Sequence, residues 1–274
     1  MSKLSIQNLG MIITNKCNLN CGHCLRGCKN NKDMKSEVID ATLKQIDGIG
    51  NLSICGGEPT MAIEVMEEIF RKVVEKKIVL NEVTTTINGT IYSEKFLELF
   101  YKIDDYVKCL YGSDKSLTNF AISYDKYHIE EMEKLGLLDK YMDNIKLYSE
   151  SPYFAGLRTI PKRGILFKEG NAINLDKNIT EEYKPIKIYV TYAGKHLKFD
   201  KDGLCNIGPL LTINPDGIIT DCDASIENQE TIYNYGNVLN DSIEEVALEK
   251  GMILKPRKWL RVSDREMKKH MKWR

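Results

Sequence analysis

Residues 14 to 24 carry the stretch Thr14-Asn15-Lys16-Cys17-Asn18-Leu19-Asn20-Cys21-Gly22-His23-Cys24, in which three cysteines follow a short apolar run. Zinc sites and iron–sulfur clusters both use cysteine thiolates at such short spacings. Three protein ligands leave one position of a tetrahedral metal site open. The stretch therefore predicts a metal centre, and an iron of a [4Fe–4S] cluster left without a protein thiolate could bind a small molecule.

Two alternatives compete with this interpretation of the loop. A disulfide framework suits small secreted proteins, whereas this chain has 274 residues and eight cysteines. Its first residues, Met1 to Ile6, lack a basic start followed by an apolar run, so we expect a reducing, cytoplasmic setting. A structural zinc site is closed by four ligands, and His23, Cys28 or a distant residue could supply the fourth.

A second motif, Leu52-Ser53-Ile54-Cys55-Gly56-Gly57-Glu58-Pro59-Thr60, follows about one helix later. The segment ending at Cys55 is typical of a short buried strand. Gly56 and Gly57 allow a ligand to approach the backbone closely, and Pro59 suits the start of a helix. Glu58 then places a carboxylate at the carboxyl end of the strand, where it could bind an ammonium group.

The three-cysteine loop followed by Gly-Gly-Glu-Pro resembles the radical SAM superfamily. The resemblance implies that Cys17, Cys21 and Cys24 hold a [4Fe–4S] cluster. It also implies that the cluster iron without a thiolate chelates S-adenosylmethionine, and that Gly56, Gly57 and Glu58 contact the methionine amino group. The electron would come from a one-electron donor such as a flavodoxin or ferredoxin.

Later segments extend this resemblance over roughly residues 10 to 195. Thr84-Thr85-Thr86-Ile87-Asn88-Gly89 looks like the third-strand segment of the family and marks Asn88 as a cofactor contact. Ala121-Ile122-Ser123-Tyr124-Asp125 looks like the fourth-strand segment, in which Ser123 would face the methionyl carboxylate and Asp125 the ribose. Arg163 is a further candidate for the carboxylate.

Two residues depart from the common family pattern. His23 stands where many members have an aromatic residue near the adenine, and it can stack there or titrate. Cys55 stands where Thr or Ser is commoner, and we interpret it as a small buried strand residue, with a redox role as the alternative. His128 lies just past the fourth strand and could reach the cofactor or open the next helix.

Composition excludes several classes of protein. A hydrophobic content of 42% and a charged content of 28% are ordinary for a globular protein, and no apolar stretch approaches the ~20 residues of a membrane span. The net charge is zero, but the segment from Lys255 to Arg274 holds nine basic and two acidic residues. We interpret this segment as a solvated helix or a docking arm for an acidic partner. We do not expect nucleic-acid binding, because the rest of the chain is acidic and the basic segment is short.

Strand and helix patterns alternate along the first 200 residues. Strands are expected near 10–14, 51–55, 79–86, 119–124, 154–160 and 186–192, and helices near 36–47, 61–76, 92–102, 127–141 and 175–184. This alternation predicts an α/β fold of parallel βαβ units, a partial (β/α)6 barrel that the resemblance also implies. We expect a core domain at residues 1–200 and an extension at 201–274.

The extension begins with a predicted β-hairpin. Its strands flank Asn214-Pro215-Asp216-Gly217, a strong turn sequence, and a helix is expected from about Asp241. Cys205 and Cys222 frame the hairpin and resemble the opening of a SPASM or twitch extension, truncated here because no cysteine follows Cys222. They could hold a second Fe–S cluster, Cys222 could donate a hydrogen atom to a substrate radical, or both could be structural remnants.

The resemblance implies reductive cleavage of S-adenosylmethionine and hydrogen abstraction from a substrate. Extensions of this kind are common in peptide-modifying enzymes, so a peptide or protein substrate is the first hypothesis. A small-molecule substrate is the second. A zinc-stabilised binding protein without enzymatic activity is the alternative from a different class.

Overall fold

The computed structural model describes residues 3–27, 29–112, 117–159, 166–184, 188–192, 204–221, 224–250 and 252–253. Its helices are α1 Ser36–Leu43, α2 Ile63–Glu75, α3 Glu94–Tyr111, α4 Lys126–Leu135, α5 Leu138–Ser149, α6 Ile226–Glu230 and α7 Ile243–Lys250, with 3-10 turns η1 Pro59–Met61 and η2 Gly170–Asn174. Its strands are β1 Lys3–Thr14, β2 Gly48–Gly56, β3 Val79–Ile87, β4 Asn119–Ser123, β5 Phe154–Arg158, β6 Leu166–Phe167, β7 Thr180–Glu181, β8 Tyr189–Tyr192, β9 Leu204–Gly208, β10 Leu211–Ile213, β11 Ile218–Thr220, β12 Gly236–Asn237 and β13 Met252–Ile253.

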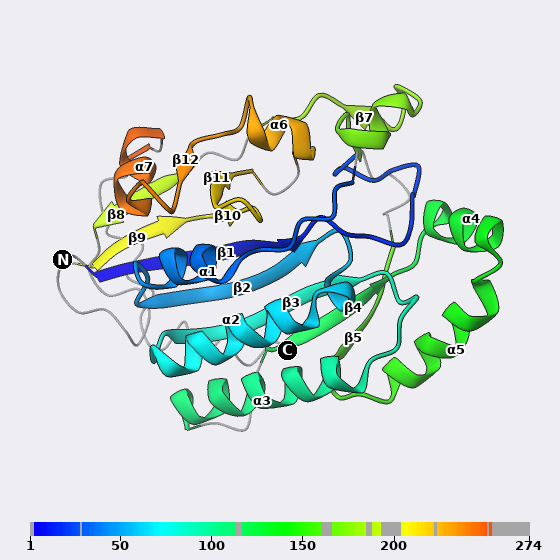
Figure 1. The fold of residues 1–274 in the computed structure, drawn as a ribbon, viewed down its shortest axis with the longest axis horizontal. Coiled ribbons are helices and arrows are strands. Elements are labelled where there is room, and N and C mark those ends of the chain that lie inside the picture. The colour runs from blue at the N-terminus through cyan, green and yellow to red at the C-terminus, as the bar shows by residue number, and fades with distance from the viewer. Residues whose placement is uncertain are drawn as a thin grey trace, which may run out of the picture.

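The first five strands form a parallel, curved sheet in chain order from β1 to β5 (Figure 1). Successive strands are joined through α1, α2 and α3, and then through the pair α4 and α5. The α/β fold with partial-barrel geometry that the alternation predicted is therefore confirmed. Parallel strands place all their carboxyl ends at one edge of the sheet, where such folds build their sites.

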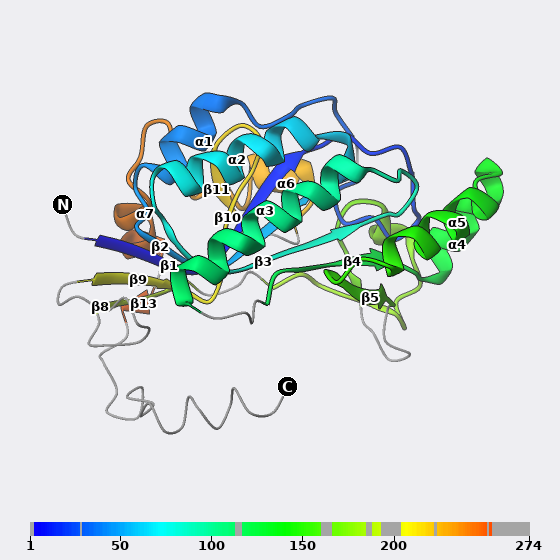
Figure 2. The ribbon, with the colours of Figure 1, turned by 90° about the horizontal axis from the view of Figure 1, so that it is seen from below.

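The two faces of this sheet differ sharply in composition. Residues on the outer face, such as Leu52, Val83 and Phe120, are fully buried under the helices. Figure 2 shows α1, α2 and α3 together on that side of the sheet. The amphipathic pattern of α2 places Met66, Phe70 and their apolar neighbours against it. The inner face is left for polar residues and for the site.

The C-terminal strands join the same sheet along β1. The first half of β1 pairs in parallel with β9 and its second half with β10. β10 and β11 form the antiparallel hairpin that the turn sequence predicted, and α7 supplies the predicted C-terminal helix. Asn214 closes the hairpin turn because its Oδ1 accepts hydrogen bonds from the backbone N–H groups of Asp216 and Ile218.

Three sequence-based element predictions need correction. The helix expected over 175–184 is absent from those residues, which hold only the short strand β7. The helix expected over 127–141 is divided into α4 and α5 because Gly136 takes a left-handed conformation, with φ of 66°. The strand predicted over 186–192 is present as β8. In the sheet it pairs with β9 and β13 and does not lie beside β5.

Other predictions fall outside the described residues. They include the domain boundary at residue 200 and the basic segment 255–274. None of the helices that the structure describes combines the length and the apolar character needed to cross a membrane.

Candidate active site

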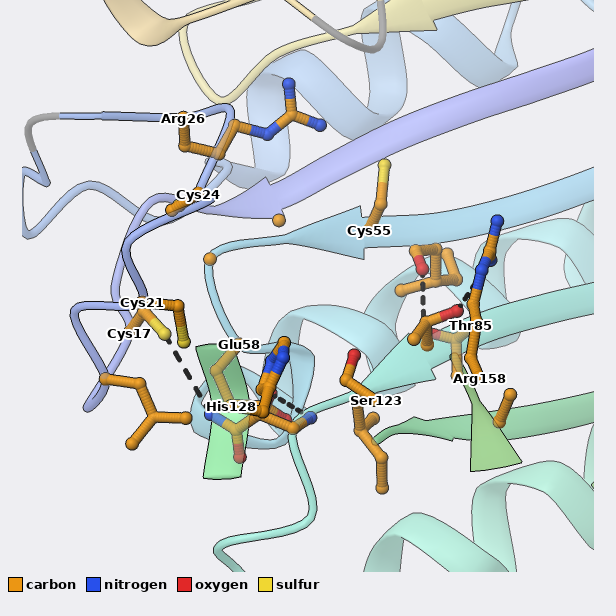
Figure 3. A pocket seen from close by; sticks show the side chains of 18 of the residues that line it. Cys17, Cys21, Cys24, Arg26, Cys55, Glu58, Thr85, Ser123, His128 and Arg158 are labelled. Atoms are coloured by element: carbon orange, nitrogen blue, oxygen red, sulfur yellow. Dashed lines mark hydrogen bonds between the residues drawn. The ribbon is translucent and has the colours of Figure 1, made fainter. Parts of the chain in front are cut away.

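A cavity of about 550 Å³ lies at the carboxyl ends of β2, β3, β4 and β5 (Figure 3). Its lining brings together the three cysteines and His23 of the first motif, Gly56, Gly57 and Glu58 of the second, and Asn88 and Ser123 from the later segments. Site residues that were predicted from four separate stretches of the sequence thus share one cavity.

The cysteine loop presents three free thiols to this cavity. Cys21 is buried, while Cys17 and Cys24 are half-buried. Burial, reinforced by the neighbouring thiols, raises the pKa of Cys21 to about 12. Burial likewise raises the pKa of Cys17. These two thiols therefore stay protonated at neutral pH until a metal ion displaces their protons, which is the behaviour expected of a metal-binding set.

The loop is held against the Gly-Gly-Glu segment by backbone contacts. The N–H of Gly57 donates to the Thr14 carbonyl at 2.8 Å, and the N–H of Glu58 donates to the Lys16 carbonyl at 2.7 Å. A Cβ atom at Gly57 would lie 2.1 Å from the Lys16 carbonyl oxygen. Glycine is therefore required here by the approach of the cysteine loop itself, a packing role beside the ligand contact that the sequence suggested.

A second segment of chain clamps the other side of the loop. Gly170 in η2 packs directly on Gly27, since a Cβ at Gly170 would lie 2.4 Å from the Gly27 nitrogen and 2.5 Å from the Cys24 carbonyl oxygen. The neighbouring Asn171 donates from its backbone N–H to the Cys24 carbonyl at 2.9 Å and from Nδ2 to the Cys21 carbonyl at 3.0 Å.

The start of α6 contacts the same loop. The N–H of Ile226 donates to the Arg26 carbonyl at 3.1 Å, and Nη1 of Arg26 donates to the Ala224 carbonyl at 2.9 Å. The buried carboxylate of Glu169 joins this segment to η2 by accepting from the N–H of Ser225 at 2.8 Å and from Nδ2 of Asn228. Two distant segments thus hold the cysteine loop as one unit, and sequence patterns did not indicate either contact.

Glu58 is a buried carboxylate, with 1% of the residue exposed. Its Oε1 accepts from both the N–H and the hydroxyl of Thr60, at 3.0 and 2.6 Å, and its Oε2 accepts from the N–H of Asn88 at 2.7 Å. Burial raises the pKa of Glu58, although these hydrogen bonds act to lower it. The side chain is fixed in place and would be stabilised as an anion by a nearby cation.

Asn88 connects this carboxylate to the cysteine loop. Its Nδ2 donates to Asn18 Oδ1 at 2.9 Å and contacts Cys17 Sγ at 3.9 Å. Its Oδ1 accepts from the N–H and the hydroxyl of Thr90, at 2.9 and 2.7 Å. The side chain is thus committed to the loop, and its backbone N–H to Glu58.

His23, Asp125 and His128 form a cluster at one wall of the cavity. Asp125 Oδ1 caps α4 through the N–H groups of Tyr127 and His128, and its Oδ2 lies 2.7 Å from Nδ1 of His128 and 3.5 Å from Nε2 of His23. Asp125 therefore caps α4, the helix that the sequence allowed His128 to open. Their ligand atoms lie within 4.8 Å of one another, so the three residues could also hold a metal ion.

His23 is arranged for stacking. Its ring lies 4.9 Å from that of Tyr127, at an interplanar angle of 20°. Burial lowers its pKa, although the Asp125 carboxylate opposes this, so the ring is mainly neutral at neutral pH. Its Nδ1 is buried without a hydrogen-bond partner among the described residues, and that atom could hydrogen-bond a bound ligand.

Two side chains close the far part of the cavity. Ser123 ends β4, and the fold uses its backbone carbonyl, which accepts from the hydroxyl of Tyr141. Arg158 ends β5, pairs in register with Ser123, and donates from Nη1 to Thr86 Oγ1 at 3.0 Å. The sequence analysis did not identify Arg158, although it is a charged residue at the last, inward-facing position of β5.

The structure describes only part of the other cysteine and arginine predictions. Arg163, Cys28 and Cys222 lie outside the described residues, and Cys205 is placed only as a backbone position in β9. Cys55 lines the cavity, but its Sγ lies 3.5 Å from the Met11 carbonyl and points away from Cys17 and Cys21 (Figure 3).

Comparison with known proteins gives a family through a match to its family model. Residues 11–158 match the family model of the Radical SAM superfamily. An uncharacterized protein of Methanocaldococcus jannaschii is 28% identical over 103 residues, 36% of this chain and 36% of that protein. A GTP 3',8-cyclase of Clostridium perfringens is 26% identical over 165 residues, 57% of this chain and 46% of that protein. The chain thus spans less than half the length of these two curated relatives.

A solved structure supports the fold. Native anSMEcpe with bound AdoMet and Cp18Cys peptide superposes with a TM-score of 0.52 at 12% identity, covering 96% of this chain and 82% of that one. At this identity the match concerns the fold alone. The partial-barrel fold therefore has a counterpart of known structure.

Proposed function

The chain belongs to the Radical SAM superfamily, and from that premise we propose that its strand-end cavity cleaves S-adenosylmethionine reductively and abstracts hydrogen from a peptide or protein substrate. Enzymes of this superfamily use a [4Fe–4S] cluster and S-adenosylmethionine, so the protein is a radical SAM enzyme rather than a zinc-stabilised binding protein. The observation that carries the proposal is that Cys17, Cys21, Cys24 and Glu58 line one cavity.

The donor set of the loop fits such a cluster. Three thiols line the cavity from one loop, while the His23 ring turns towards Asp125 and the Cys55 thiol towards the Met11 carbonyl. We therefore assign Cys17, Cys21 and Cys24 as cluster ligands, with one iron left for the methionine end of the cofactor. When bound, the two cofactors supply an electron and then a 5′-deoxyadenosyl radical that abstracts hydrogen.

Three features support the cofactor assignments. The buried carboxylate of Glu58 would receive the methionine ammonium, because burial leaves its negative charge in need of a cation. The Ser123 hydroxyl would meet the methionyl carboxylate. His23, with its buried and unpartnered Nδ1, would meet the adenine. Gly56, Gly57, Asn88 and Asp125 complete the proposed pocket, with Arg163 a proposed further contact.

The chain's own residues perform the remaining tasks. Glu58 and Ser123 would fix the two ends of the methionine moiety, so that the sulfonium faces the cysteine loop. Thr60 and Asn88 hold the Glu58 carboxylate in one orientation before the cofactor arrives. The two clamps on the cysteine loop, from η2 and from the start of α6, hold its backbone in place.

A peptide substrate is supported by the C-terminal hairpin. The hairpin and the later helix α7 resemble extensions found on many radical SAM enzymes, which are common in peptide-modifying members. Between them, α6 touches the cysteine loop through Arg26. Cys205 and Cys222 remain proposed ligands of a second cluster, with hydrogen donation by Cys222 as the alternative. We also propose a flavodoxin-like or ferredoxin-like electron donor and a cytoplasmic setting.

A small molecule is the second candidate substrate. The observation that favours it is the name of the Clostridium perfringens relative, a GTP 3',8-cyclase. A nucleotide would occupy the same inner face of the barrel that a peptide side chain would reach.

Anaerobic reconstitution tests the proposal directly. We expect about four irons and four sulfides per chain for one cluster, or about eight of each if the hairpin cysteines bind a second. After reduction, the enzyme should release methionine and 5′-deoxyadenosine from S-adenosylmethionine. Mass spectrometry of candidate peptides and of GTP then separates the two substrate classes. Zinc without iron, or no cleavage after reduction, would contradict the proposed activity.

A further inference from the structure

The inner face of the sheet carries small polar residues on three neighbouring strands. They share one register, because Ser53 of β2 pairs with Thr84 of β3, and Thr84 pairs with Asn119 of β4. These side chains are half-buried, whereas their outer-face neighbours are fully buried. Such a floor offers hydroxyl and amide groups to a polar ligand and little apolar surface to an apolar one.

Arg158 brings a positive charge to this floor. It occupies the inward position at the end of β5, and its neighbours on β4 and β5 are the small residues Ala121 and Gly156, which pair with each other. Its side chain can therefore cross β4 and reach Thr86 on β3 at 3.0 Å. Thr86 pairs with Ala121, so this contact lies one step deeper in the barrel than Ser123.

Among the described residues that line the cavity, none is an acidic partner of Arg158. Among the described lining residues the single carboxylate is that of Glu58, which accepts hydrogen bonds from Thr60 and Asn88 instead. Thr86, the partner of Arg158, is neutral. A guanidinium that meets only a hydroxyl retains most of its capacity for an anion.

The direction of the side chain separates it from the cofactor pocket. The guanidinium runs along the inner face away from Glu58 and His128 (Figure 3). Nη1 donates to Thr86, which leaves the planar edge formed by Nε and Nη2 for a further ligand. That edge matches two oxygens of a carboxylate or a phosphate, and a bidentate pair of this kind fixes orientation as well as position.

We propose that Arg158 binds an oxyanion group of the substrate, a carboxylate or a phosphate, on the polar floor of the barrel. The inference rests on the proposed function, because it takes the cavity as the place where the substrate binds. A carboxylate would come from an acidic side chain of a peptide, and a phosphate from a nucleotide. Arg158 would then determine which class of substrate binds and how the substrate is positioned. The cofactor would be held by Glu58, Ser123 and the cysteine loop.

Binding of a simple oxyanion to the reconstituted enzyme tests the site without knowledge of the substrate. Inorganic phosphate and acetate are titrated calorimetrically into wild type and Arg158→Gln, each with S-adenosylmethionine present. We expect the anion affinity to fall by at least about tenfold in the variant, since charged hydrogen bonds are lost. Arg71→Gln, which removes an exposed arginine of α2 paired with Glu75, is the matched control and should bind as wild type does.

Two results would overturn the inference. One is phosphate and acetate binding that is absent from wild type or equal in wild type and Arg158→Gln. The other is a variant with weakened S-adenosylmethionine binding or slower cofactor cleavage without substrate, which would assign Arg158 to the cofactor. If Arg158→Gln does not retain its cluster, Arg158→Lys replaces it, because lysine keeps the charge and loses the planar fork. A threefold or greater loss of phosphate affinity is then expected, and wild-type affinity would overturn the inference.

Paired substrates distinguish this inference from the proposed function. Peptides that differ only by Glu or Gln are compared, as are GTP and guanosine. A preference for the anionic member that disappears in Arg158→Gln supports the site and identifies its source. If neither class is turned over, the proposed substrates fail, while the phosphate and acetate titrations still decide whether Arg158 forms an oxyanion site.

Discussion

The backbone N–H of Asn88 donates to Oε2 of Glu58 at 2.7 Å, while the side chain of Asn88 lies against the cysteine loop. One residue at the end of β3 therefore joins the carboxylate proposed for the methionine ammonium to the loop proposed for the cluster. A displacement of either part is transmitted to the other through a short and buried connection.

The charge of Glu58 should determine the affinity for S-adenosylmethionine. In Glu58→Gln the side chain keeps its shape but loses the charge that would meet the ammonium. We expect the dissociation constant for S-adenosylmethionine to rise by about 10- to 100-fold, the range for a charge-assisted hydrogen bond. Equilibrium binding to the reconstituted enzyme measures this. Iron content should not change, and a variant that binds the cofactor as tightly as wild type would contradict the assignment.

The same carboxylate should make the protein without cofactors less stable as pH rises. Burial raises the folded-state pKa of Glu58 above its ordinary value of 4.5, so the unfolded chain releases this proton first. The free energy of unfolding should therefore fall above pH 4.5, by at most about 1.4 kcal/mol per pH unit, until the folded-state pKa is passed. Urea titrations between pH 4.5 and 8 of wild type and Glu58→Gln isolate this slope, which the variant should lack. Parallel pH profiles for the two proteins would be the contrary result.

Local patterns were sufficient to predict the part of the fold that positions the site. The strands β2, β3 and β4 each end at a residue that the sequence singled out or next to one, because apolar runs and turn residues mark strand ends directly. Cys17, Glu58, Asn88 and Ser123 were named from four separate motifs, and all four line one cavity. The hairpin around Asn214 could also be predicted from the sequence, since its turn residues lie within a few positions of one another.

Contacts between segments that are far apart in the sequence could not be predicted in this way. Gly170 looks like a loop glycine until Gly27 is found against it, and Arg158 looks like a surface residue until β4 lies beside it. The helix expected over 175–184 failed for a related reason, because an apolar pattern in a short segment does not fix its state against tertiary packing.

The hydroxyl of Ser123 should contribute to the affinity for S-adenosylmethionine but not to the stability of the fold. The fold uses the carbonyl of this residue, which accepts from Tyr141, so Ser123→Ala should unfold at the temperature of wild type. Loss of one hydrogen bond to the methionyl carboxylate should weaken S-adenosylmethionine binding by about 3- to 10-fold. Ser149→Ala, at an exposed position of α5, is the control and should leave cofactor binding unchanged. Equal affinity in Ser123→Ala and wild type would exclude the contact.

The clamp on the cysteine loop can be tested by comparing two glycines. Gly170 and Gly136 both have a left-handed backbone, with φ of 52° and 66°. A Cβ at Gly136 meets nothing within 4 Å, whereas one at Gly170 would lie 2.4 Å from the Leu25 carbonyl oxygen and 2.5 Å from that of Cys24. Both alanine variants should lose about 1–2 kcal/mol of stability from the left-handed conformation alone.

Only Gly170→Ala should also disturb the cluster, because the added methyl group forces the cysteine loop away from η2. We expect its iron to be lost several-fold faster to a chelator, with an altered visible spectrum, while Gly136→Ala keeps the rate and spectrum of wild type. Iron release measured under conditions where both variants are fully folded separates loop geometry from global stability. Equal rates in the two variants would mean that η2 does not position the cluster ligands. The backbone hydrogen bonds from Gly57 to Thr14 and from Glu58 to Lys16 would then suffice to hold the loop.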